Sequence, residues 1–116
     1  MNWKEAKSRI SKSIYVGLDL NSKKSKQRRI LGYNPHGCFV VSIGRRASIN
    51  IPWNMLKNCF DAMIDKECYD GRVFRSLYPR EAKVHPCYVH VIGQIFVVGK
   101  IVDTKGKQYF PCQDIR

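Results

Sequence analysis

The clearest periodic pattern in the chain lies between Pro52 and Lys66, where large apolar side chains recur at steps of three and four residues. This spacing predicts an amphipathic helix over about 52–66, with Pro52 at its first position, where a missing N–H costs nothing. The stripe consists of Trp53, Leu56, Cys59, Phe60, Met63 and Ile64. Such a stripe needs a second apolar layer, which a sheet can provide.

Short apolar segments before this helix predict strands. Residues 14–20 and 47–51 alternate between apolar and polar side chains, and residues 38–43 are apolar apart from one serine. A tight turn at 44–46 joins the last two segments, and residues 30–33 form a further short strand.

The second half of the chain predicts another hairpin. Residues 87–92 and 95–102 are rich in β-branched side chains and are joined through a Gly-Gln pair. Residues 73–78 fit one or two helical turns that Pro79 ends, residues 80–86 read as a polar loop, and residues 107–110 as a last strand.

Together these elements predict an α+β fold. We expect a single small domain over residues 1–116, in which one antiparallel sheet of hairpins packs on helix 52–66. A short basic helix begins near Trp3, and a basic loop spans 21–29. At 116 residues the chain can bury a core without metals or disulfides.

The positive net charge of the chain limits the kinds of partner that we expect it to bind. The chain has 21 Lys and Arg against 9 Asp and Glu, and +10 of its net charge of +12 lies in the first 60 residues. Residues 23–29 read Lys-Lys-Ser-Lys-Gln-Arg-Arg, between two strand-like segments. Such a loop suits polyanions. An anionic membrane is disfavoured, because the N-terminal helix has too few apolar side chains.

We therefore predict a small basic protein that binds nucleic acid, DNA or RNA, through phosphates and with modest sequence discrimination. The predicted contact residues are Lys23, Lys24, Lys26, Arg28, Arg29, Arg45, Arg46, Lys4, Lys7, Arg9 and Lys12. Tyr15 and Tyr33 would stack on unpaired bases if exposed, but we expect them to cover the edge of the core. Helix 52–66 carries two lysines against two aspartates and is a poor major-groove reader.

A metal site is disfavoured, and we expect no cofactor. A composite zinc site would combine His36 and Cys38 with His85 and Cys87, and the chain has no diagnostic ligand spacing. In the predicted strand, Cys87 and His90 point to opposite faces.

Two alternative functions remain open. A small toxin-like ribonuclease would draw on His85, His90, Arg72, Arg80 and Tyr88, which have no diagnostic spacing, so an enzyme is less favoured than a binding protein. The other alternative is a protein-interaction or inhibitor module that acts on a nucleic-acid-processing enzyme. Its contact side would be the neutral segment that includes Phe74, Leu77 and Tyr78, although these side chains also suit the core.

The spacing of the cysteines and the polar N-terminal residues indicate the cellular location that we expect for this protein. Five irregularly spaced cysteines favour reduced thiols over a disulfide framework. No apolar N-terminal stretch resembles a secretory signal, and no segment is long enough to span a bilayer. We expect a cytoplasmic protein, monomer or homodimer, without a membrane partner.

Overall fold

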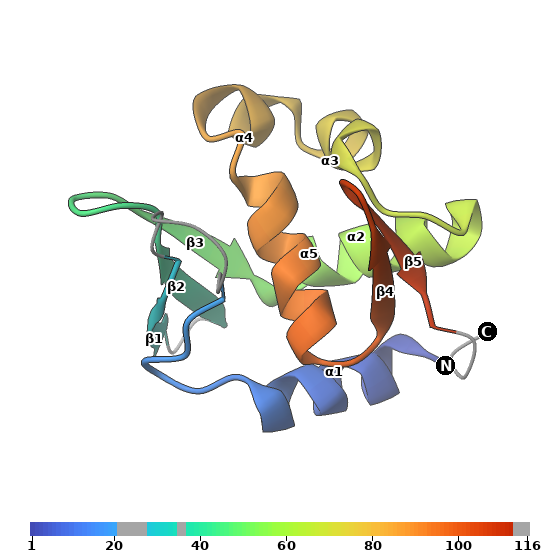
Figure 1. Ribbon diagram of the computed structural model, residues 1–116, viewed down its shortest axis with the longest axis horizontal. Helices are drawn as coiled ribbons and strands as arrows, with labels where there is room; N and C mark the ends of the chain where they lie inside the picture. The colour runs from blue at the N-terminus through green and yellow to red at the C-terminus, as the bar shows by residue number, and fades with distance from the viewer. Residues whose placement is uncertain (21–27, 35–36, 113–116) are drawn as a thin grey trace.

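The computed structural model describes residues 1–20, 28–34 and 37–112. Over these residues the elements are α1 (Trp3–Ser13), β1 (Ile30–Asn34), β2 (Cys38–Ser42), β3 (Ser48–Pro52), α2 (Trp53–Lys66), α3 (Gly71–Leu77), α4 (Pro79–Val84), α5 (Tyr88–Val98), β4 (Val102–Lys105) and β5 (Gln108–Pro111). Helices and antiparallel strands are mixed in one domain, so the predicted α+β class is confirmed (Figure 1).

The strands form two sheets instead of the single sheet predicted. The larger has the order β1–β2–β3, and the smaller is the hairpin β4–β5. Strand β2 is central, as its apolar run predicts, and Phe39 pairs with Tyr33 on one side and Ile51 on the other. Pro52 ends β3 and is the N-cap of α2, so the helix begins at Trp53, one residue later than predicted.

The predicted strand over 14–20 is wrong in its first half. Val16 and Gly17 form a turn, Gly17 has a φ of 94°, and the Val16 side chain is 64 % exposed. A positive φ interrupts the extended backbone, so the alternation of side chains between two faces cannot continue through this glycine.

Residues 18–20, which follow this turn, form backbone hydrogen bonds with Arg28 and with Ile30, the first residue of β1. The Leu20 N–H donates to the Arg28 carbonyl at 2.7 Å, and the Ile30 N–H donates to the Leu18 carbonyl at 2.9 Å. These bonds join the two sides of residues 21–27, the main part of the predicted basic loop, which lies outside the described residues.

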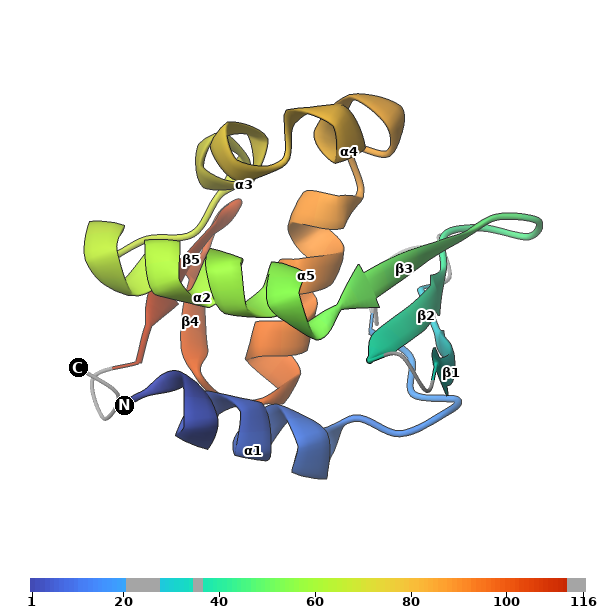
Figure 2. The same cartoon turned by 180° about the vertical axis from the view of Figure 1, so that it is seen from behind.

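Helix α5 occupies the place of the predicted second hairpin, so that prediction is wrong. An all-round apolar segment suits a buried helix as well as a buried strand, and periodicity does not separate them. Six of the eleven residues of α5 are buried. The helix runs from α4 at one end of the domain to α1 at the other (Figures 1 and 2). Burial on most sides outweighs the strand preference of its valines and isoleucines.

Helix α4 replaces most of the loop predicted over 80–86. Pro79 follows α3 and also occupies the first position of α4, where its fixed φ and missing N–H are compatible with a helix. The proline therefore separates two short helices instead of ending helical structure.

Tyr109 joins the hairpin β4–β5 to α5. Its ring lies so close to Gly93 that a Cβ on Gly93 would be 2.2 Å from the ring Cζ. Tyr109 and Tyr69 also exchange backbone N–H···O=C bonds of 2.8 and 2.9 Å. The Tyr69 hydroxyl donates to the Val89 carbonyl at 2.9 Å. These contacts set the positions of the hairpin, α5 and the start of α3 relative to one another.

Helix α2 packs against α1, α3, β3 and β5. The structure confirms most of its predicted apolar stripe, but Met55 is buried and Ile64 is 38 % exposed. Trp3 of α1 meets Trp53 and Phe60, with ring-centroid distances of 6.0 and 5.5 Å. The N-terminal helix is therefore part of the core and is not a mere basic extension.

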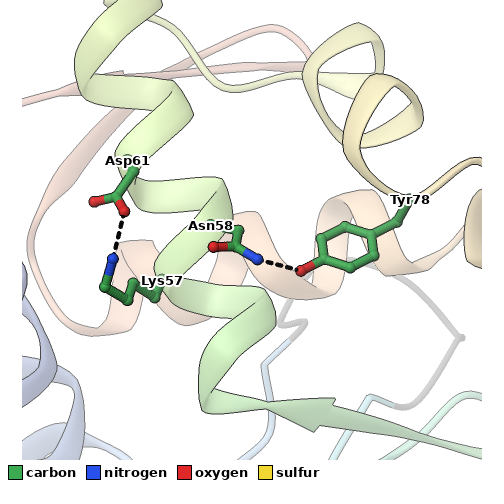
Figure 3. A network of polar contacts seen from close by, with 4 residues as sticks. All are labelled: Lys57, Asn58, Asp61 and Tyr78. Carbon is green, nitrogen blue, oxygen red and sulfur yellow. Dashed lines mark hydrogen bonds and ion pairs between the residues drawn. The ribbon is translucent and has the colours of Figure 1, made fainter.

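The outer face of α2 is polar and electrically balanced. Lys57 Nζ lies 2.7 Å from Asp61 Oδ2, and both side chains are about half exposed (Figure 3). Asn58 Nδ2 donates to the Tyr78 hydroxyl at 2.8 Å, which ties α2 to the residue between α3 and α4 (Figure 3). Lys57 is therefore a half-exposed cation whose charge is balanced by the neighbouring Asp61 carboxylate.

Substitution of Gly93 tests the close approach of Tyr109. We expect Gly93→Ala to destabilise the fold by about 3 kcal/mol, because the methyl group would overlap the ring despite the better helix propensity of alanine. Gly32→Ala is the matched control, since an added Cβ there meets nothing within 4 Å. Chemical denaturation should show a loss for Gly93→Ala alone; equal stability of both variants would contradict this packing.

Candidate nucleic-acid interface

A groove of about 1100 Å³ lies between the hairpin β4–β5, α3, the junction of α4 with α5, and the end of β2. The cationic and imidazole side chains that line it are Arg28, Arg72, Arg75, Lys107, His85 and His90. We call this feature the basic groove. Among its described lining residues, Asp70 is the only acid.

The four cations of the basic groove come from separate parts of the chain. Arg28 precedes β1, Lys107 lies in the turn between β4 and β5, and Arg72 and Arg75 lie on α3. The two α3 arginines share a helix face because they are three residues apart. A Cβ on Gly71 would be 2.7 Å from Arg75 Nη1, so the glycine leaves room for this guanidinium to fold back over the helix start.

The carboxylate of Asp70 is already committed to the fold. As the N-cap of α3, its Oδ1 accepts hydrogen bonds from the N–H groups of Arg72 and Val73, and its Oδ2 accepts one from Gln108 Nε2 at 3.1 Å. Burial acts to raise the pKa of Asp70, but these bonds and the Arg72 charge outweigh it and leave the pKa lowered. Asp70 thus joins α3 to β5, and the groove keeps an excess of positive charge.

His90 lies on the α5 side of the basic groove and contacts Tyr109. Its Nδ1 is 3.1 Å from the Tyr109 hydroxyl oxygen. Burial lowers the pKa of His90 from its usual 6.5, and the charges of Arg28 and Lys107 lower it further. The imidazole is therefore mainly neutral at pH 7.

Helix α5 changes the expected relation between Cys87 and His90. The predicted strand would separate them, but as the N-cap and third residue of a helix they both line the basic groove. His85, the C-cap of α4, lines it as well. Within residues 1–20, 28–34 and 37–112, no three His, Cys, Asp or Glu side chains gather to hold a metal. His36 of the composite zinc site lies outside these ranges.

Two of the catalytic candidates do not line the basic groove. Arg72 does, but Arg80 and Tyr88 are absent from its lining. The Tyr88 hydroxyl donates to the Asn50 carbonyl at 3.3 Å, and its ring stacks on Phe74 with centroids 5.7 Å apart. Phe74 is fully buried, so it belongs to the core and not to a protein-binding surface.

A second depression adjoins the basic groove. It has a volume of about 470 Å³ and is lined by Arg29, Arg45 and Arg46, and Gly44 borders both hollows. We call this second hollow the arginine depression. Four of the predicted contact residues therefore border two adjoining hollows: Arg28 lines the basic groove, and Arg29, Arg45 and Arg46 line the arginine depression.

The cations of α1 lie elsewhere. Helix α1 is at the opposite end of the domain from α3 and α4 (Figures 1 and 2). Lys7 Nζ is 5.0 Å from the centroid of the Trp53 ring, and Arg9 Nη1 donates to the Lys100 carbonyl at 3.4 Å. Lys4 and Lys12 are exposed. None of the four lines the basic groove or the arginine depression.

The two tyrosines near the basic loop are more exposed than expected. Tyr15 is 63 % exposed and Tyr33 is 52 % exposed. Tyr33 nevertheless packs on Phe39 at 5.1 Å between centroids and accepts a hydrogen bond from Trp53 Nε1 at 2.7 Å. With Lys7, both tyrosines line a third hollow of about 350 Å³.

Sequence reasoning missed two cations of the basic groove, Arg75 and Lys107, and considered Arg72 only for catalysis. For the α3 arginines the reason is that residues 61–90 carry equal numbers of basic and acidic side chains, so the net charge of this segment conceals where the individual charges lie; Lys107 is outside the segment. The three-residue spacing of the α3 arginines was the available signal. Lys23, Lys24 and Lys26 of the predicted site lie outside the described residues.

Comparisons of the chain with protein families, with curated proteins and with solved structures find no match. Within the described ranges, no helix has the length and apolar character needed to cross a membrane. None of the five cysteines forms a disulfide bond. Cys59 is fully buried, and this burial raises the pKa of its thiol to about 12, which disfavours the thiolate that a nucleophile needs.

The lowered pKa of His90 has a consequence for stability. Because the unfolded chain binds this proton more readily than the folded one, stability should fall as pH drops below about 6.5. In NMR titrations we expect His90 to titrate below 6.5 and His90→Gln to reduce the loss of stability in acid. A His90 midpoint at or above 6.5 would contradict the assigned environment.

Proposed function

We propose that this protein binds nucleic acid through the phosphate backbone, using the basic groove and the arginine depression. The main support is the convergence of Arg28, Arg72, Arg75 and Lys107 on one groove, whose acidic residue is already hydrogen-bonded. Counterion release from phosphates favours such binding and carries little base information, so we expect modest sequence discrimination.

The shape of this surface favours a single strand over a duplex. Helix α5 borders the groove, but it is buried on most sides and cannot enter a major groove as a recognition helix does. A flexible single strand can instead follow a concave, cationic path, with phosphates near Arg72, Arg75 and Lys107. The arginine depression extends this path beyond Gly44.

A paired substitution on α3 tests the role of the basic groove. We expect Arg72→Ala with Arg75→Ala to weaken binding of labelled single strands and to reduce the salt slope by about 1 per lost phosphate contact. Fluorescence anisotropy over a range of salt concentrations measures both. Lys57→Ala with Lys66→Ala is the matched control, because it also removes two cations, and neither lines either hollow. The same loss in both variants would show that only total charge matters.

Neutralisation of the basic run tests the sequence-derived part of the proposal. Replacing Lys23, Lys24, Lys26, Arg28 and Arg29 with glutamine should lower affinity for all sequences alike and flatten the salt dependence. Unchanged affinity with an unchanged slope would remove the run from the interface.

The same titrations distinguish the protein-interaction alternative. A module that docks on a nucleic-acid-processing enzyme should ignore free DNA and RNA at physiological salt and bind only the partner protein. Absence of binding by the intact protein under those conditions would overturn the proposed function.

A further inference from the structure

We propose that the basic groove also cleaves single-stranded RNA without a metal ion, with His90 as the general base and His85 as the general acid. The inference rests on the proposed nucleic-acid binding, since the RNA backbone must lie in this groove. Two of the three histidines of the chain line it, together with four cations. Two histidines therefore border the groove in which we propose that the phosphates lie.

His90 is held in a form that suits a base. In the neutral tautomer whose Nδ1–H donates to the Tyr109 hydroxyl oxygen, at 3.1 Å, the second ring nitrogen keeps its lone pair. Burial, Arg28 and Lys107 all favour the neutral imidazole, so it can accept a proton at pH 7. The Tyr109 ring is itself fixed against Gly93, so the hydroxyl that orients the imidazole comes from a rigid part of the fold.

His85 approaches the groove from another element. It is the C-cap of α4, five residues before His90, and the Tyr88 N–H donates to its carbonyl at 3.1 Å. The connection between α4 and α5 therefore places two histidines from different elements along one groove. Arg72, Arg75 and Lys107 can stabilise the charge that develops on the phosphate oxygens as the phosphorus is attacked.

The reaction needs no other reagent. Nε2 of His90 takes the proton of the 2′-hydroxyl, whose oxygen attacks the adjacent phosphorus and forms the P–O2′ bond. The P–O5′ bond breaks while protonated His85 donates its proton to the departing 5′ oxygen. The products are a 2′,3′-cyclic phosphate and a free 5′-hydroxyl. His90 then releases a proton to water, and His85 takes one up.

The test is cleavage of a labelled single-stranded RNA in buffer with EDTA, with the product ends identified by mass spectrometry. We expect cyclic-phosphate ends from the intact protein, and rates at least about 100-fold lower for His85→Gln and for His90→Gln. Lys57→Ala, on the balanced face of α2, should cleave normally. RNA methylated at every 2′ oxygen should bind but stay intact.

Tyr109→Phe separates the orienting role of the hydroxyl from its structural role. It keeps the ring against Gly93 but removes the contact with His90. We expect a lower kcat with little change in KM, because Tyr109 is a positioning residue that does not touch RNA. Unfolding curves of all variants check that they are folded.

The outcomes separate this inference from the proposed function. Binding of methylated RNA without cleavage of ordinary RNA would overturn the ribonuclease inference and leave nucleic-acid binding intact. Cleavage by both histidine variants at the rate of the intact protein would also overturn it. So would cleavage of RNA that is methylated at every 2′ oxygen. Failure to bind methylated or ordinary RNA, or DNA, at physiological salt would overturn both proposals.

Discussion

The contact of Tyr109 with helix α5 is the constraint on which the rest of the site depends. The ring occupies the space that any side chain at Gly93 would need, and the Tyr109 backbone pairs with Tyr69. These two contacts fix the hairpin β4–β5 relative to α5 and to the start of α3. Lys107, on the same hairpin, thereby reaches the groove that Arg72 lines. The packing that closes the core thus also assembles the basic groove.

The basic groove shows how a chain segment with no net charge can contribute a charged surface. Asp70 caps α3 and accepts a hydrogen bond from Gln108, so its charge stabilises the helix start and the hairpin contact. Lys57 and Asp61 balance one another on the outer face of α2. Arg72 and Arg75 are left on the side of α3 that borders the groove. Where each charge lies depends on the helix face that its residue occupies, and the net charge of the segment gives no information about this.

The α+β class, α2 and the β2–β3 hairpin were predictable, because each depends on local periodicity or turn chemistry. Helix α5 was not, since its apolar pattern fits either a buried helix or a buried strand, and long-range packing decides between them. That error had a direct effect on the site. In a strand Cys87 and His90 would point apart, whereas in the helix they border one groove with His85. Arg28 was among the predicted contact residues of the basic run and lines the groove, but Arg75 and Lys107, which line it as well, were not predicted.

The sequence by itself determined an excess of positive charge, an amphipathic α2 and a polyanion as the expected partner, because composition and short-range spacing carry that information. Only the tertiary structure decided where the cations meet. Arg28, Arg72 and Lys107 are far apart in the chain, and their convergence requires the pairing of Tyr69 with Tyr109 and the burial of α5. It also decided that two histidines border the groove, since this requires residues 88–98 to be a helix packed against α4 and α1.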